Sequence, residues 1–535
     1  MCKMERGGRS LEYALAVAVL VLSFAVSLGM FAAFGAHNLD ADMSSEMLLA
    51  RLQNEEGTLL SRSWYYSTEL RVVSPVPLFQ LGLLLFPEDW QAARTVATGI
   101  MLAGIVASFL YFARKARMGA SGVLMAAILT MPFSQVYAYV GFQNGGYSVY
   151  LMLVFVLLGL VLGMEQSRRR PARLAVIALL SLWGGMGGIR MMLFLALPLA
   201  GACALELFDA LRREERIAHA LRGGLSPRLS AAAVIFAATA AGYAFNEKVL
   251  TRLYDYDHYS GIALSMPSSD VVFAQLTGIA EFFGCRASSR LFSARGVASL
   301  LGFAMMGLCA LALCVLLRRR REGRLSTENG MLLVFTVFSV ALGMMVNVLT
   351  GNYFVRYYLP GLLMLVVMLL LAWQGTSCKN RMLRAAVPLA IAAVFALEAG
   401  ICLRQDQRMG EAPYEKAAGW LLQNGYTQGF ATFWNAATLT EATNGAITVY
   451  TMPDPYWQDD YKSLTMLRFL QEKANVERAE SGALEGEVFV LLTDEELVQG
   501  VPYADDGRLA CRTEAGSIYL YEDDEALRSA ANAKQ

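Results

Sequence analysis

Two carboxylates, Asp40 and Asp42, stand two positions apart in a polar segment that begins where the first apolar stretch ends. Glu46 follows four positions after Asp42, so the two share a helix face if a helix begins near Asp42. Such a group could deprotonate an acceptor hydroxyl or hold a divalent cation through oxygen ligands. The pattern also fits an Asp42 that caps a surface helix beside a solvated Asp40, so spacing alone leaves both interpretations open.

Aromatic and charged side chains follow in the same segment, in the run SRSWYYSTELRVV. Trp64, Tyr65 and Tyr66 suit either a membrane–water interface or stacking against a sugar ring, and the interface is favoured for any single ring. Glu69 and Arg71 could pair with each other, or Arg71 could contact a phosphate. The candidates that would support a substrate or a metal in this region are Glu46, Tyr65, Tyr66 and Glu69.

A single arginine, Arg356, stands in the otherwise uncharged run GNYFVRYYLPG and is followed by Tyr357. A guanidinium in this setting could bind a lipid phosphate through two parallel hydrogen bonds, with Tyr357 beside it. It could also only extend toward lipid headgroups. Arg190, in GGMGGIRMM, has the same two options, and there the headgroup interpretation is favoured.

The composition decides what kind of protein must position these residues. Hydrophobic residues make up 56% of the 535-residue chain and charged residues 17%, and long uncharged apolar runs recur along it. These features indicate a polytopic α-helical membrane protein. The eight cysteines and three histidines show neither a disulfide framework nor a zinc-site spacing, and no feature indicates a nucleic-acid partner.

The apolar runs predict about eleven transmembrane helices. Lys and Arg concentrate in alternate connecting loops, which places the N-terminus in the cytoplasm and the C-terminus outside. The predicted spans are residues 11–34, 92–112, 119–139, 147–164, 172–188, 191–208, 229–245, 296–317, 331–349, 357–373 and 385–402. The Lys- and Arg-rich loops are residues 114–117, 168–173, 212–228, 318–324 and 379–384.

Two outer loops are long, residues 37–91 and residues 246–295. Within the first, residues 76–86 are apolar but too few to cross a bilayer, so we interpret them as an interfacial or re-entrant helix. If they crossed, every later loop would change sides. The expected membrane domain is residues 1–403.

The chain changes character in residues 404–535, where apolar runs shorten to strand length and alternate with helical patterns. Asn-Gly pairs at 424–425 and 444–445 mark turns between them. This composition predicts a small extracytoplasmic α/β domain.

The order of these features resembles the GT-C superfamily of membrane glycosyltransferases, in which an Asp-x-Asp element opens the loop after the first span. Three patches carry the resemblance, which is specifically to a bacterial group that is RgtA/B/C/D-like and similar to dolichyl-phosphate-mannose-protein mannosyltransferases. The patches are DADMSSEMLLARLQNEE with the following WYYSTELRV, RYYLP at residues 356–360, and FATFWNAATLTEATNG at residues 430–445.

The resemblance implies a sugar donor carried on a polyprenyl phosphate, an envelope glycan, lipid or protein as acceptor, and a place in the plasma (inner) membrane. Asp40 would be the general base toward the acceptor, with Asp42 assisting it or holding a cation. Arg356 would bind the donor phosphate and stabilise the charge of the leaving group.

The sequence departs from metal-dependent relatives, which carry a second acidic motif in the next outer loop. Here that loop reads YVGFQNGGYS and contains no carboxylate. A metal-independent mechanism is therefore favoured, and Asp42 and Glu46 are the ligands offered if Mg²⁺ or Mn²⁺ is bound. The choice between Asp40 and Asp42 as base stays open.

Other functions remain open as well. A polysaccharide polymerase or ligase with a diphosphate-linked donor would depend on several outer arginines, of which Arg286, Arg290 and Arg295 are the one cluster. A transporter or flippase would need ionisable residues at mid-membrane, and a scaffold would tolerate substitution of Asp40. The enzymatic interpretation requires Asp40 and Asp42 to lie near Arg356, above a cavity that a lipid can enter from the side.

Overall fold

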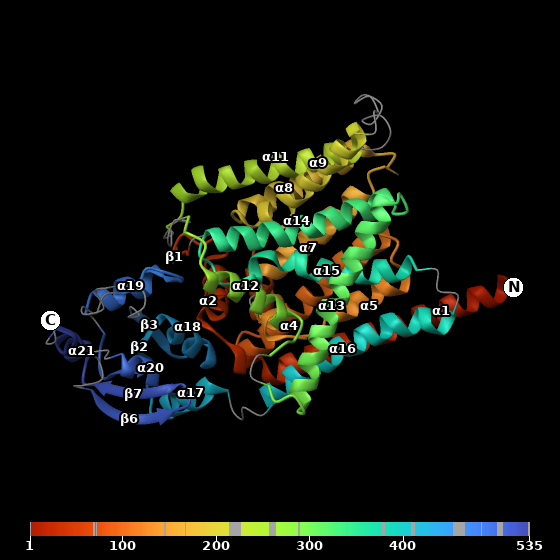
Figure 1. Ribbon diagram of the computed structural model, residues 1–535. Coiled ribbons are helices and arrows are strands. Elements are labelled where there is room, and N and C mark those ends of the chain that lie inside the picture. The colour runs from red at the N-terminus through yellow and green to blue at the C-terminus, as the bar shows by residue number, and fades with distance from the viewer. Residues whose placement is uncertain are drawn as a thin grey trace.

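A bundle of long helices forms the larger part of the molecule, and an α/β lobe lies against one end of it (Figure 1). We call that end of the bundle the domain end and the other the far end. The computed structural model describes residues 2–67, 70, 72–143, 146–165, 167–212, 226–255, 264–286, 289–376, 380–407, 412–452, 466–482, 484–499 and 507–532.

The bundle consists of α-helices joined by short 3-10 and π-helical segments. The α-helices are α1 (Cys2–Phe34), α2 (Ala41–Glu56), α3 (Val76–Leu85), α4 (Trp90–Lys115), α5 (Gly119–Leu129), α6 (Gln135–Ala138), α7 (Gly146–Leu162), α8 (Arg170–Met186), α9 (Leu197–Arg212), α11 (Ser226–Lys248), α12 (Ser269–Phe282), α13 (Ala294–Arg321), α14 (Thr327–Leu349), α15 (Leu359–Gln374) and α16 (Arg381–Gln407). The short segments are η1 (Gly35–Asn38), η2 (Tyr139–Gln143), η3 (Met192–Ala196), η5 (Leu250–Arg252) and η6 (Val355–Tyr358).

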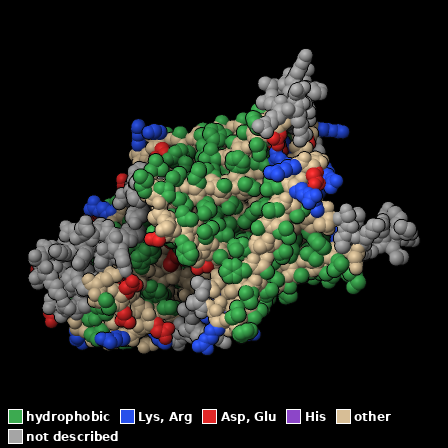
Figure 2. Space-filling model, viewed as in Figure 1, with side chains coloured by type: hydrophobic (Ala, Val, Ile, Leu, Met, Phe, Trp, Pro, Cys, Tyr) green, Lys and Arg blue, Asp and Glu red, His purple; other side chains and the backbone are tan. Residues whose placement is uncertain are grey.

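Among the described residues, eight helices are long and apolar enough to cross a membrane, and a bent pair would make a ninth. Hydrophobic side chains cover most of the bundle surface in view (Figure 2). The protein is therefore a multi-pass membrane protein. The eight are Leu11–Asn38, Trp90–Lys115, Met192–Asp209, Pro227–Arg252, Ala294–Arg321, Thr327–Leu349, Val355–Gln374 and Met382–Arg404.

The predicted count of eleven spans is not confirmed, and the differences have local causes. The predicted span 119–139 is interrupted after α5, because Pro132 cannot donate a helical hydrogen bond and Ser134 starts α6 by accepting from the Tyr137 amide at 3.1 Å. Helix α6 with η2 then meets α7 at a bend of 84°. The predicted spans 147–164 and 172–188 form α7 and α8, each of 17 residues.

The short apolar stretch 76–86 forms helix α3, which has ten residues and is too short to cross a bilayer. It packs closely against α4, since a Cβ built on Gly82 would lie 2.4 Å from the Ala93 carbonyl oxygen. Glycine at this position lets the two backbones approach, and it fixes the return of the first outer loop toward the bundle.

The lobe is a five-stranded mixed sheet in the order β3-β2-β5-β7-β6, with helices packed on it. Strands β2, β3 and β5 are parallel, whereas β7 runs antiparallel to β5 and β6. The expected small α/β domain is therefore present. Its strands are β2 (Gln428–Thr432), β3 (Thr448–Met452), β5 (Val488–Leu492), β6 (Arg508–Thr513) and β7 (Gly516–Tyr521), and its helices are α17 (Pro413–Gln423), α18 (Phe433–Ala442), α19 (Lys473–Glu480), α20 (Asp494–Val498) and α21 (Asp524–Asn532).

The lobe and the first outer loop share one hydrophobic core, which the sequence did not predict. Strand β1 (Trp64–Tyr65) pairs antiparallel with β4 (Gln471–Glu472), and the Lys473 amide donates to the Ser63 carbonyl at 2.8 Å. Trp64 and Tyr66 are 2% and 0% exposed in this core. They can therefore serve neither as interfacial belt residues nor as a sugar platform, which corrects both sequence interpretations for these two rings.

Candidate active site

Asp40 is the cap of helix α2 and not a solvated loop residue. Its backbone is extended, and its Oδ1 accepts a hydrogen bond from the Met43 amide at 2.8 Å. Burial raises the pKa of the Asp40 carboxyl above its ordinary value, the charge of Asp42 adds to this, and the Met43 amide, Tyr139 and Arg94 oppose it. A carboxylate in this state is a stronger base than a free aspartate.

Tyr139 connects Asp40 with Arg356. It is the first residue of the π-helical segment η2, and its hydroxyl lies within hydrogen-bonding reach of the Asp40 carboxylate. The Arg356 guanidinium interacts with the hydroxyl groups of Tyr139, Tyr147 and Tyr357. One tyrosine thus bridges the two residues that the sequence analysis placed at the centre of the site, and π-helical turns of this kind are frequent at functional sites.

Arg356 lies in η6, where its Cζ is 4.3 Å from the Phe354 ring centroid and 5.5 Å from that of Tyr357. Its Nε is buried and has no hydrogen-bond partner among the residues that the structure describes. A buried N–H without a partner is rare, and it suits an anionic oxygen that a ligand would supply.

A buried network of amides and a phenol holds the Arg356 loop in place. The Gln275 side chain of α12 donates to the Asn352 carbonyl at 2.8 Å and accepts from Asn347 and Tyr358, each at 2.9 Å. Asn347 in turn donates to the Phe354 carbonyl at 2.7 Å. These bonds fix the backbone on both sides of Arg356, so its guanidinium has a defined position.

Arg190 shares an aromatic partner with Arg356. Its Cζ lies 5.0 Å from the Tyr147 ring centroid and 5.9 Å from that of Tyr150. The sequence favoured an Arg190 that extends toward lipid headgroups, but the structure places its guanidinium against Tyr147, which also interacts with Arg356. Arg190 and Arg356, which come from separate segments, therefore both interact with Tyr147.

An ion pair between the bundle and the lobe lies behind Asp40. Arg94 of α4 donates to both carboxylate oxygens of Glu441 in α18, at 2.8 and 2.7 Å, and to the Met43 carbonyl at 3.0 Å. The two side chains are 1% and 3% exposed. The pair fixes the first turn of α2, and therefore Asp40, relative to the lobe.

The lobe also contributes Tyr414, at the start of α17. Its hydroxyl donates to Asn435 at 2.7 Å, and burial, with the negative charges of Glu496 and Asp40, raises the pKa of Tyr414 to about 12. Tyr414 is thus close enough to Asp40 for the two charges to interact, and the lobe forms one wall of the site.

An apolar cavity of about 250 Å³ lies beside Tyr139. Its walls come from α1, η1, α6, η2 and the end of α16, and Tyr139 is among its lining residues. Figure 2 shows a hollow between the bundle and the lobe, with acidic side chains at its edge. Tyr139 is thus common to the cavity wall and to the interactions of Asp40 and Arg356.

The sequence matches no protein-family model and no curated protein. The fold is similar to ArnT from Cupriavidus metallidurans bound to undecaprenyl phosphate, with a TM-score of 0.51 and 12% identity over 95% of this chain and 97% of that one. An oligosaccharyltransferase from Archaeoglobus fulgidus, in complex with Zn and sulfate, gives a TM-score of 0.48 and 12% identity over 88% of this chain and 68% of that one. The chain has the GT-C fold.

Within this GT-C fold, the other candidates from the sequence are dispersed. Asp42 lies in the first turn of α2 and is half-buried, and Glu46 is 3% exposed one turn later. Among the described residues, no group of three or more acidic, histidine or cysteine side chains could hold a metal ion. Within those residues, Asp42 and Glu46 therefore belong to no such group.

Tyr65 and Tyr66, the described members of the remaining first-loop candidates, contact other groups than Asp40 and Arg356. Tyr66 donates its hydroxyl to the Ser61 carbonyl at 2.9 Å, inside the core shared with the lobe. The Lys473 ammonium lies over the Tyr65 ring, with Nζ 5.5 Å from the ring centroid. Glu69 and Arg71 lie outside the described residues.

Four site residues escaped the sequence analysis: Tyr139, Tyr147, Arg94 and Tyr414. A weak signal exists for the first two, because both tyrosines stand in the short YVGFQNGGYS loop, which contains no carboxylate. Arg94 looked like one charge at the start of a span, and its partner Glu441 lies 347 positions away. No local pattern predicts a pair of that separation.

Proposed function

We propose that this protein is a membrane glycosyltransferase that moves a sugar from a polyprenyl-phosphate donor to an acceptor hydroxyl at the domain end of the bundle. One observation carries the proposal: a partly buried carboxylate with a raised pKa, Asp40, is joined through Tyr139 to a buried arginine N–H without a partner in Arg356. A base and an anion site lie on either side of one tyrosine.

The donor is proposed to enter through the apolar cavity between α1 and α16, because a polyprenyl chain needs an apolar path that opens to lipid. The ArnT structure of similar fold contains undecaprenyl phosphate. Arg356 would bind the donor phosphate, and Arg190 would add a second positive charge beside Tyr147.

The chemistry then follows from the two ends of this site. Asp40 accepts the proton of the acceptor hydroxyl while that oxygen attacks the anomeric carbon of the sugar. The bond between the anomeric carbon and the phosphate oxygen breaks, and the polyprenyl phosphate leaves with the electron pair. Arg356 stabilises the negative charge that develops on this phosphate. The proposed step is written without a metal.

The acceptor is proposed to approach between the bundle and the lobe, where Tyr414 and Asp40 face each other. An envelope glycan, lipid or protein would present its hydroxyl there. The Lys- and Arg-rich loops support a cytoplasmic far end, so residues 404–535 would be extracytoplasmic, and we propose the plasma (inner) membrane as the location.

The polymerase or ligase alternative is less well supported by the arginines it would use. Arg286 is committed to an ion pair with Glu398 at 3.1 Å, and Arg290 and Arg295 are exposed. Arg356, by contrast, interacts with Tyr139, which also interacts with Asp40.

The test is transfer from a labelled polyprenyl-phosphate sugar by the purified protein in lipid nanodiscs, with an envelope extract as acceptor. The wild-type protein is expected to release polyprenyl phosphate and label the acceptor, and Asp40→Asn is expected to do neither. Mass spectrometry of envelope glycans with and without the protein would identify the product. Full activity in Asp40→Asn would contradict the proposed mechanism.

A further inference from the structure

A second cavity, of about 650 Å³, lies at the far end of the bundle. It is bounded by the C-terminal ends of α4, α13 and α15 and by the turn that starts α14. Helix α4 begins at Trp90, whose amide donates to Asn444 of the lobe at 3.0 Å, and ends at Lys115 in this cavity. A helix of 26 residues is about 39 Å long, so the two cavities lie at opposite ends of the bundle.

Positive charge dominates the cavity wall. The lining includes four cations, Lys115, Arg117, Arg319 and Arg324, against one acid, Glu328, and Arg324 also pairs with Glu322 at 3.0 Å. The acid is already engaged, because Glu328 pairs with Arg228 at 3.4 Å. Cations that surround one cavity repel each other, and an anion between them would relieve that repulsion.

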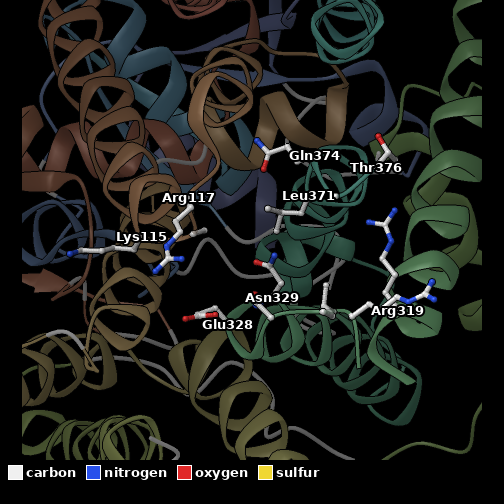
Figure 3. Close-up of a pocket in the computed structure, with 13 residues that line it drawn as sticks. Lys115, Arg117, Arg319, Glu328, Asn329, Leu371, Gln374 and Thr376 are labelled. Carbon is white, nitrogen blue, oxygen red and sulfur yellow. The ribbon is translucent and has the colours of Figure 1, made fainter. Parts of the chain in front are cut away.

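Figure 3 shows how the side chains are arranged. Arg117 and Arg319 lie on opposite sides of the cavity, with Asn329 and Leu371 between them, whereas Lys115 turns its ammonium away. The Arg319 guanidinium is held by the Ala372 carbonyl at 3.0 Å, in the last turn of α15. The wall thus combines guanidinium groups from two chain segments with amide and hydroxyl groups, the donors that phosphoryl oxygens accept from.

Arg117 adds an independent observation. Its backbone has φ of 57°, a left-handed conformation that costs free energy for any residue other than glycine. Glycine is the usual residue after a helix end, yet this position carries arginine. Such strain persists where the side chain contributes something that glycine would not, and here the side chain projects into a cationic cavity.

We propose that the far-end cavity binds the phosphoryl headgroup of an anionic phospholipid. The lining supplies both halves of such a ligand, with Arg117, Arg319 and Arg324 for the phosphate and Leu325 and Leu371 toward the acyl chains. Basic cavities between transmembrane helices on the cytoplasmic side are suited to anionic headgroups. This site is separate from the proposed transfer reaction and does not depend on it.

The test compares lipids and variants on the full-length purified protein. Native mass spectrometry should show phosphatidylglycerol retained in clear preference to phosphatidylcholine. Arg117→Gly removes one cation and relieves the left-handed backbone, so the lipid-free variant should unfold at the same or a higher temperature while its phosphatidylglycerol affinity falls by roughly fivefold or more. A merely structural arginine could not give these opposite shifts.

Arg318→Gln is the matched control, since Arg318 is on the same helix as Arg319, is 82% exposed and does not line the cavity. It should bind phosphatidylglycerol as the wild type does. Equal affinity in Arg117→Gly and wild type, or an equal loss in Arg318→Gln, would overturn the proposal. A thermal shift with inorganic phosphate and none with phosphatidylglycerol would overturn the lipid as the source of the phosphoryl group.

Discussion

The two ends of the bundle hold polar groups in different ways. At the domain end, Asp40 is fixed by the Met43 amide and reached by Tyr139, and the Arg356 loop is held by buried amide hydrogen bonds. At the far end, Arg117 and Arg324 are exposed on the ends of helices. At the domain end, hydrogen bonds fix the positions of the side chains, which the proposed transfer reaction would require. At the far end, exposed side chains supply positive charge, which the proposed headgroup binding would require.

The largest expected effect is at Asp40. Asp40→Asn keeps the shape and the helix cap but removes the base, so transfer should fall by roughly 10²- to 10⁴-fold. The unfolding temperature should not fall, because an ionised carboxyl whose pKa is raised in the folded state destabilises that state at neutral pH. Transfer assays and thermal unfolding would measure the two quantities.

Asp42→Asn is the matched control, with the same change of charge two positions away in the first turn of α2. It should retain most of the activity, which would also decide between the two aspartates as base. If both variants lost activity equally, the claim that the domain end fixes one particular carboxylate as the base would be wrong.

The next largest effect is expected at the ion pair between bundle and lobe. Arg94→Met leaves Glu441 buried without its partner, so we expect about 3–5 kcal/mol of destabilisation in chemical denaturation. The double variant Arg94→Met/Glu441→Met should recover most of this loss, since no charge is left buried. A double variant no more stable than the single one would show that the pair is not the interaction that joins the two parts.

Replacing arginine with lysine tests most directly whether the two ends of the bundle differ in their need for guanidinium geometry. Arg356→Lys keeps the charge but not the planar fork, so the KM for the polyprenyl-phosphate donor should rise about tenfold or more, with little change in the acceptor KM. Arg117→Lys should keep its phosphatidylglycerol affinity, because there charge suffices. Equal tolerance of lysine at both positions would remove the difference between the ends.

The smallest effect concerns pH. If Asp40 is the base, activity should rise with pH through its raised pKa, so the acid limb lies above the range of an ordinary aspartate. Tyr139→Phe removes an interaction that lowers the pKa of Asp40, so this limb should move further up in pH. If the acid limb of the pH–activity profile does not move in Tyr139→Phe, then Tyr139 does not influence the pKa of the base.

The same raised pKa affects folding with a defined sign. The folded state binds the Asp40 proton more tightly than the unfolded state does. Protonated Asp40 therefore contributes its full stabilisation of the folded state below the unfolded pKa of about 3.8. It is lost as pH rises through the folded value. Asp40→Asn should therefore show a flatter dependence of unfolding free energy on pH over this interval.

Much of the architecture could be predicted because its signals are local. Long uncharged runs identify spans such as residues 296–317 without knowledge of their neighbours, since a bilayer requires only length and apolarity. The strand-length runs after residue 403 likewise indicated the α/β lobe that the structure shows. The span count of eleven was not confirmed, because Pro132 and Ser134 interrupt one apolar run and because α7 and α8 have only 17 residues each.

The chain by itself determined the membrane character, the acidic element at Asp40 and the arginine at 356, because residue type and short spacing suffice for these. Only the tertiary structure decided that Asp40 and not Asp42 caps α2, that Tyr139 joins Asp40 to Arg356, and that Arg94 meets Glu441. The cap depended on backbone geometry, because the spacing allowed either aspartate to start the helix. The other contacts join segments far apart in sequence, and packing of the helices and the lobe, not local propensity, brings them together.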